Sequence, residues 1–154
     1  MEVIIKKPSE ISENEINQIA DLIDKGAQID GGIEQIKLRL TTAEYISFIL
    51  DQNKVVTTAT LKNPVQSYKK RVFESAQFLN NFEEYTHELG YIATAEDRQD
   101  EKLCQKLLSV FIPIVIKYRM FATTRKESII HILGKFGFIP AGVKYNDDLI
   151  LLVN

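Results

Sequence analysis

Side chains that could bind a metal ion or form a covalent intermediate are few in this sequence. Its two histidines, His87 and His131, and its single cysteine, Cys104, lie far apart along the chain. A zinc site needs three or four such ligands, so we expect no metal centre. Cys104 could pair with a histidine as a nucleophile, but no cysteine-hydrolase motif surrounds it. Its apolar neighbours favour a small core residue.

Carboxylates offer a second kind of chemistry, the attraction of a cationic amine. Glu83 and Glu84 lie in a stretch that favours a loop, and Glu88 begins the segment that we expect to form the next strand. Acids at such places attract positively charged ligands. Solvated loop acids, and an exposed acid at the edge of a strand, are the simpler alternatives.

The elements that position these residues follow from apolar spacing and turn residues. Alternating or β-branched runs predict strands at 3–5, 45–50, 55–61, 88–94, 120–123, 141–145 and 149–153. Apolar residues at helical spacing predict one helix that begins after 12–15, helices over 33–40 and 101–119, and another that begins after 124–127. A polar helix is predicted over 68–76. The break at Asp30-Gly31-Gly32 separates the first two helices.

Short motifs mark where these helices begin, bend and end. Ser12 with Glu15, and Thr124 with Glu127, have the spacing of capping boxes and should each open a helix. Pro113 should bend the helix at 101–119, because proline removes one amide and crowds the preceding turn. The last helix should end in a left-handed cap at Gly137.

The mixed order of elements predicts an α/β (α+β) fold, with a mixed central sheet of about six to seven strands and helices on both faces. A length of 154 residues predicts a single domain over 1–154. The last two strands should form a hairpin across Asn146 and Asp147, which tolerate positive φ. An exposed strand at this hairpin could pair with a second copy in a homodimer.

Composition narrows the classes of partner and the location. Hydrophobic residues make up 45% and charged residues 26% of the chain, which excludes a disordered or collagen-like protein. The net charge of −2 argues against a nucleic-acid partner. The most apolar stretch, 107–116, is about half as long as a membrane span, so no membrane partner is expected. One cysteine and a first segment without a signal-peptide pattern favour a cytoplasmic location.

Three stretches, in this order of elements, resemble the GNAT acyltransferase superfamily: Glu88-Leu89-Gly90-Tyr91-Ile92-Ala93-Thr94, Phe121-Ala122-Thr123-Thr124-Arg125 and Gly137-Phe138. The resemblance implies the GNAT acyl-CoA N-acyltransferase fold, in which two central parallel strands splay apart. It also implies acetyl-CoA as cosubstrate, with its pantetheine arm on the backbone of Ile92, Ala93 and Thr94. Its pyrophosphate would lie at the start of the helix near Glu101, where the helix dipole favours an anion.

The pyrophosphate loop of the superfamily, Q/R-x-x-G-x-G/A, aligns with Gln99-Asp100-Glu101-Lys102-Leu103-Cys104. By resemblance, Gln99, Lys102, Leu103 and Cys104 therefore join the cosubstrate site. Lys102 replaces the first glycine, whose role is to adopt positive φ and allow a close backbone approach. Because acids outnumber bases in this loop, we expect acetyl-CoA to bind more weakly than is typical.

The resemblance also assigns the proton transfers. Glu88 matches a glutamate that acts as general base on the acceptor amine. The asparagine that many members carry aligns with Lys126, and the tyrosine that often protonates the leaving thiolate aligns with Leu133, which has no proton to give. His131 and Tyr145 are the predicted substitutes.

Two functions from different classes follow from this resemblance. The first is an acyl-CoA-dependent N-acyltransferase, which moves an acetyl group from acetyl-CoA to a small-molecule or peptide amine by direct attack. The second is a catalytically degenerate GNAT-fold protein that acts as a binding or regulatory module. Lys102, Lys126 and Leu133, the departures from the superfamily pattern, favour the second, and binding of coenzyme A would discriminate between them.

Overall fold

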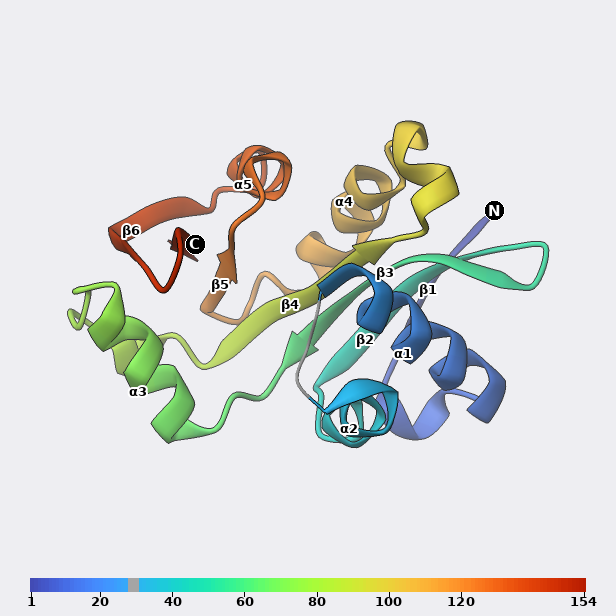
Figure 1. The fold of residues 1–154 in the computed structure, drawn as a ribbon, viewed down its shortest axis with the longest axis horizontal. Coiled ribbons are helices and arrows are strands. Elements are labelled where there is room, and N and C mark those ends of the chain that lie inside the picture. Colours follow the sequence, from blue (N-terminus) through green and yellow to red (C-terminus); the bar gives the residue numbers. More distant parts are fainter. Residues whose placement is uncertain (28–30) are drawn as a thin grey trace. The chain divides into compact units, whose positions relative to one another are not determined.

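A computed structural model describes residues 1–27 and 31–154 and shows a mixed sheet of seven strands (Figure 1). The strands are β1 (Glu2–Lys6), β2 (Tyr45–Asp51), β3 (Lys54–Lys62), β4 (His87–Thr94), β5 (Met120–Thr124), β6 (Ile139–Tyr145) and β7 (Leu149–Val153). They pair in the order β1-β2-β3-β4-β5-β7-β6. The predicted mixed sheet is confirmed.

Five α-helices and three 3₁₀ segments connect the strands in the described residues. The α-helices are α1 (Glu13–Ala27), α2 (Gly32–Leu40), α3 (Gln66–Ser75), α4 (Leu103–Val115) and α5 (Glu127–Gly134). The 3₁₀ segments are η1 (Pro8–Glu10), η2 (Phe82–Glu84) and η3 (Glu96–Glu101). Part of the predicted break at Asp30-Gly31-Gly32, namely Asp30, lies outside the described residues.

Contacts within the chain define two compact units. Unit 1 comprises Met1–Lys62 and Gly90–Val115, and unit 2 comprises Asn63–Leu89 and Ile116–Asn154. The boundary falls inside β4, so this strand contributes Glu88 to unit 2 and Thr94 to unit 1. The expectation of a single domain over 1–154 stays a prediction.

In unit 1, helices lie on both faces of the antiparallel strands β1, β2 and β3. Ile46 and Phe48 of β2 pack with Ile19, Ile23 and Leu40 of α1 and α2 in one core cluster. Successive strand residues point to opposite faces, so the side chains between them point away from that cluster. Helix α4, whose residues are not part of the cluster, packs on the same three strands.

The first capping box is confirmed at the start of α1. The amide of Glu15 donates to Ser12 Oγ, the amide of Ser12 donates to Glu15 Oε1, and both distances are 3.1 Å. Burial acts to raise the pKa of Glu15, but the Ser12 hydrogen bonds and the Lys6 ammonium outweigh it and lower that pKa. The box therefore ties the helix start to an ionised carboxylate.

We expect Ser12→Ala to lower the free energy of unfolding by about 1 kcal/mol, because the Glu15 amide at the start of α1 loses the hydroxyl that accepts its hydrogen bond. Urea unfolding at neutral pH measures the loss. The exposed Ser9, which lies within η1, supplies the control Ser9→Ala. Equal effects of the two substitutions would contradict the prediction.

In unit 2, β5 has a different neighbour on each side. It is parallel to β4, with His87 opposite Met120 and Glu88 opposite Phe121, and antiparallel to β7. The parallel arrangement expected for these strands is thus confirmed, and their divergence further along stays a prediction. The hairpin of β6 and β7 is also confirmed. Asn146, Asp147 and Asp148 adopt positive φ between the two strands.

Two helix boundaries differ from the sequence-based expectation. The helix predicted over 101–119 is α4, Leu103–Val115, because Lys102 adopts a left-handed conformation that ends the right-handed path on its N-terminal side. Pro113 lies inside α4, two residues before the helix ends.

The prediction of a second capping box at Thr124 and Glu127 was wrong, although helix α5 does begin nearby. Lys126 is the N-cap of α5 and Glu127 its first residue, so Glu127 is too early to reach back across the first turn. Thr124 still belongs to β5, and its hydroxyl accepts a hydrogen bond from the Lys126 amide at 3.1 Å. Gly137 has φ of 92°, the expected left-handed conformation, three residues beyond the end of α5.

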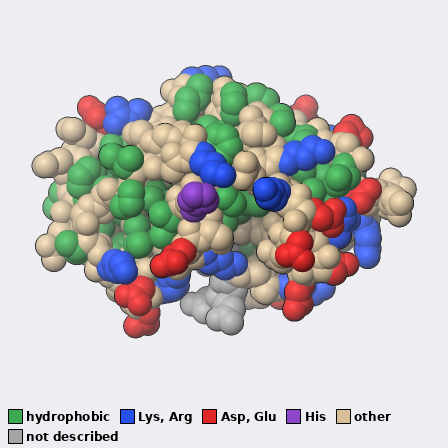
Figure 2. All heavy atoms as spheres, turned by 90° about the horizontal axis from the view of Figure 1, so that it is seen from above, with side chains coloured by type: hydrophobic (Ala, Val, Ile, Leu, Met, Phe, Trp, Pro, Cys, Tyr) green, Lys and Arg blue, Asp and Glu red, His purple; other side chains and the backbone are tan. Residues whose placement is uncertain are grey.

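The surface carries charges of both signs. On the face shown in Figure 2, acidic and basic side chains are interspersed with apolar ones. Among the described residues, no helix combines the length and the apolar character that crossing a membrane requires.

Candidate active site

Glu88 is a buried carboxylate near the start of β4. It is 2% exposed, and the Tyr68 hydroxyl of α3 donates a hydrogen bond of 2.9 Å to its Oε2. A carboxylate inside a protein core is uncommon, because leaving water disfavours its charged form unless hydrogen bonds replace the solvent. The contact from Tyr68 supplies one such bond.

Tyr145, at the end of β6, is the second titratable group of this cluster. Its hydroxyl oxygen is fully enclosed and has no hydrogen-bond partner among the residues that the structure describes. Burial first, and then the charge of Glu88, raise the pKa of Tyr145 to about 12, against a smaller lowering by Arg125. The phenol therefore keeps its proton at neutral pH.

Tyr68 links Glu88 to β5. Burial, followed by the charge of Glu88 and the hydrogen bond to it, raises the pKa of Tyr68 far above that of a free tyrosine. A hydrogen bond from the Thr123 side chain opposes this rise in the pKa of Tyr68. Unit 2 thus brings together a carboxylate that can accept a proton and two phenols that hold theirs.

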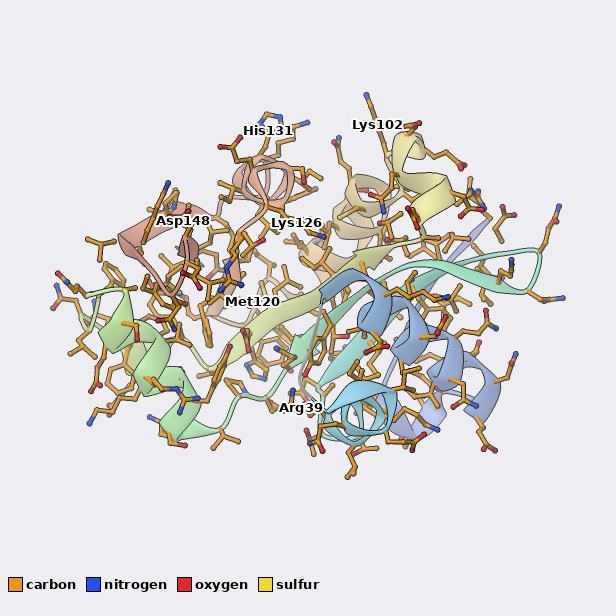
Figure 3. The ribbon with its side chains drawn as sticks, in the orientation of Figure 1. Arg39, Lys102, Met120, Lys126, His131 and Asp148 are labelled. Carbon is orange, nitrogen blue, oxygen red and sulfur yellow. The ribbon has the colours of Figure 1, made fainter. Side chains whose placement is uncertain are left out.

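The structure places the two predicted proton donors differently. Tyr145 lies within the electrostatic reach of Glu88, as the raised pKa of its phenol shows. His131 is exposed on α5 (Figure 3), and in the described part of the chain no contact joins it to Glu88. Leu133, at the position of the superfamily's tyrosine, is fully buried. The geometry therefore favours Tyr145 over His131.

Sequence reasoning missed Tyr68, although a signal for it was present. Tyr68, Val72 and Ala76 follow one another at intervals of four residues and share the face of α3 that also carries Phe73. That spacing places Tyr68 on the buried side of the helix, where a hydroxyl needs a polar partner. The sequence could predict its burial but not its partner.

In unit 1, the C-terminal end of β4 is anchored to β3. Thr57 Oγ1 donates to the Ala93 carbonyl at 3.0 Å, and the Ala95 amide donates to the Val56 carbonyl at 2.8 Å. Backbone groups of successive strand residues point to opposite edges. Those of Ile92 and Thr94 therefore point away from β3, which leaves these two as the stronger candidates for contact with a ligand strand.

The loop after β4 combines features for and against an anion. Lys102 has φ of 56° and ψ of 31°, the left-handed conformation that glycine adopts easily. It lies immediately before α4, and the amides of the first turn of a helix point out of its N-terminal end, where they can bind an anion. The Lys102 side chain extends outward in Figure 3 and is exposed. Lys102 thus adopts the conformation of the superfamily's glycine without being one.

Other side chains of this loop are engaged within the protein. The Arg98 guanidinium donates from Nη2 to Asp51 Oδ2 at 2.9 Å and to Glu101 Oε1 at 2.8 Å. These two carboxylates largely compensate its positive charge. The Gln99 side chain donates to the Thr94 carbonyl at 2.7 Å and holds the turn against the strand. The first turn of α4 contains Leu103, which is buried, and Cys104, which is half-buried. These contacts shape the loop but add little positive charge.

The described residues lack the arrangement of side chains that a metal site requires. No group of three or more histidine, cysteine, aspartate or glutamate side chains there is arranged to hold a metal ion.

Comparison with known proteins gives a likeness at the level of structure. No family model and no curated protein matches the sequence. Escherichia coli ElaA superposes with a TM-score of 0.73 and 16% identity, over 99% of this chain and 98% of that chain. An acyl-CoA N-acyltransferase from Pseudomonas aeruginosa superposes with a TM-score of 0.70 and 9% identity, over 99% of this chain and 98% of that chain. An IAA acetyltransferase from Bacillus cereus superposes with a TM-score of 0.62 and 16% identity, over 99% of this chain and 98% of that chain. At these identities the likeness concerns the fold.

Proposed function

We propose, from the premise that this chain has the GNAT acyl-CoA N-acyltransferase fold, that it is an acyl-CoA-dependent N-acyltransferase. It moves an acetyl group from acetyl-CoA to the amine of a small molecule or peptide by direct attack. The observation that carries this proposal is the buried carboxylate of Glu88, which is hydrogen-bonded to the phenol of Tyr68 and within electrostatic reach of the phenol of Tyr145.

Glu88 and Tyr145 divide the proton transfers between them. Acetyl-CoA, when bound, supplies an activated thioester. As the amine nitrogen bonds to the thioester carbon and the carbon–sulfur bond breaks, Glu88 accepts one N–H proton and the Tyr145 hydroxyl gives one to the sulfur. Return of the proton from Glu88 to the Tyr145 oxygen restores both groups. No covalent enzyme intermediate is needed.

The two transfers support each other electrostatically. The negative charge of Glu88 is one of the causes that raise the pKa of Tyr145. When Glu88 takes the proton of the amine, this charge disappears, and the pKa of Tyr145 moves back toward its ordinary value. Tyr145 thus becomes a better acid at the moment when the leaving sulfur needs a proton.

The residues proposed to hold the cosubstrate lie in unit 1. The backbone of Ile92 and Thr94 would take the pantetheine arm, and the turn at Lys102 with the start of α4 would take the pyrophosphate. Gln99 supports the turn, as its hydrogen bond to Thr94 indicates. Ala93 and Cys104 would contribute mainly to packing, because Ala93 is buried and Cys104 half-buried.

Coenzyme A binding, followed by an amine panel, tests the proposal. Calorimetry on the full chain should detect coenzyme A, and acetyl-CoA with some small-molecule or peptide amines should release free thiol. Binding without transfer to any amine would favour a GNAT-fold regulatory module. The buried Leu133, which has no proton to donate, supports that alternative. Failure of both binding and transfer would overturn the proposed function.

We expect Lys102→Gly to tighten acetyl-CoA binding about fivefold, because loss of the side chain lets a phosphate approach the backbone more closely, while the left-handed conformation is already present with lysine. Calorimetric titration of both proteins measures the change. Gln52→Gly is the control, since Gln52 is also left-handed and exposed but lies in the turn between β2 and β3. Tenfold weaker binding would instead identify the Lys102 ammonium as a phosphate ligand.

A further inference from the structure

We propose that Tyr68 is a positioning residue for Glu88: the hydrogen bond that its hydroxyl donates fixes the Glu88 carboxylate and sets the pH range in which it accepts the proton of the amine. This inference rests on the proposed function for its catalytic consequence. The contacts that carry it all lie within unit 2.

The direction of the hydrogen bonds follows from the groups involved. A phenol has one proton to donate and lone pairs with which to accept. The Tyr68 hydroxyl donates to Glu88 Oε2 at 2.9 Å. An ionised carboxylate only accepts hydrogen bonds, so the single proton of Tyr68 is directed at Glu88.

Helix α3 fixes the position of the Tyr68 ring. Tyr68 packs against the core cluster of unit 2, to which Val72 and Phe73 of the same helix belong. The ring therefore cannot move away from Glu88 without disturbing packed side chains. A carboxylate held by a rigid donor keeps a fixed orientation, which suits a group that must meet a substrate proton.

A hydrogen bond donated to a carboxylate favours its ionised form. Removing the Tyr68 hydroxyl should thus make Glu88 easier to protonate. The rate of acyl transfer would then begin to fall at a higher pH than in the parent protein. The sign is opposite to what would follow if Tyr68 accepted a proton from a neutral Glu88.

Other charged and titratable groups face this site from the neighbouring elements. Tyr145 of β6 interacts with both Tyr68 and Glu88, and Arg125, which follows β5, acts on Tyr145. His87 precedes Glu88 in β4, so it points to the opposite face of the strand, where its ring lies 4.1 Å from that of Tyr118. Lys69 of α3 donates to the Tyr85 carbonyl at 3.1 Å. The substitution below leaves these side chains in place.

The test compares Tyr68→Phe with the parent protein in the dependence of kcat on pH, at saturating acetyl-CoA and a fixed amine. We expect the acidic limb to move upward by about one pH unit, with coenzyme A binding unchanged. Tyr85→Phe is the matched control, because it removes a phenol from the same core whose hydroxyl accepts from Arg119. An unmoved limb in folded Tyr68→Phe would overturn the inference.

A second readout separates this inference from the proposed function. In protein with ¹³C-labelled glutamate carboxyl groups, Glu88→Gln identifies the Glu88 signal, and its NMR titration should shift to higher pH in Tyr68→Phe. Such a shift in a protein without transfer would support the role of Tyr68 and count against the transferase. Equal titration curves for the parent and Tyr68→Phe would overturn the inference whether or not transfer occurs.

Discussion

Glu88→Gln should lower kcat by about a hundredfold near neutral pH, while coenzyme A binding stays almost unchanged. Glutamine has nearly the same shape, and its side-chain oxygen can still accept the hydrogen bond that Tyr68 donates to Glu88. It cannot, however, accept the proton of the amine. The loss therefore concerns the proton transfer and leaves the packing of the site in place.

Steady-state rates against pH, with any amine that the parent protein accepts, measure this effect. The parent rate should fall as the pH drops and the carboxylate becomes protonated, and this acidic limb should vanish in the variant. Glu74→Gln is the control, because Glu74 is an exposed acid on α3 that faces Lys70. An unchanged kcat in Glu88→Gln would remove Glu88 from the mechanism and direct attention to His131, Tyr145 or solvent.

Phe73→Ala should lower the free energy of unfolding by about 3–5 kcal/mol. Phe73 is fully buried on α3, and its ring lies 5.2 Å from Phe121, 5.6 Å from Tyr85 and 6.1 Å from Phe82, between ring centroids. Truncation removes apolar area and leaves a cavity that these rings cannot fill without leaving their positions.

Urea unfolding measures this loss, with Leu79→Ala as the control. Leu79 is 48% exposed, so its truncation should cost less than about 1 kcal/mol. A loss below about 1 kcal/mol for Phe73→Ala would contradict the packing described for unit 2. Because α3 also carries Tyr68, an accompanying loss of activity would be expected from the same packing.

The strands were predictable because their signals are local. β2 and β3 are β-branched and aromatic runs on either side of a short polar connection, and their pairing needs no information from elsewhere in the chain. The Ser12 and Glu15 box likewise depends on one turn of helix. The boundary at Lys102 was missed because a lysine gives no sign of the left-handed conformation that it adopts.

The candidate site was predictable only in part. Glu88 and Tyr145 were singled out by resemblance and by residue type, and the structure places them within electrostatic reach of each other. Their proximity depends on the pairing of β4 with β5 and of β5 with β7, which joins segments distant in sequence, and on the hairpin of β6 and β7. Tyr68 lies in none of the stretches that carry the resemblance, so its contact with Glu88 becomes visible only in the folded structure.

The bulge in β6 bears on whether the edge of the sheet is open to a further strand. Gly142 has φ of 70°, a Cβ there would lie 1.9 Å from the Ala76 carbonyl oxygen, and the next amide, that of Val143, donates to the same carbonyl at 2.8 Å. β6 is the last strand in the order of the sheet, the kind of edge on which a foreign strand can be added and aggregation can start. At Val143 this edge already has its hydrogen bond, and the bulge breaks the regular spacing that an incoming strand would need. Growth of the sheet is therefore blocked at this point by the end of α3.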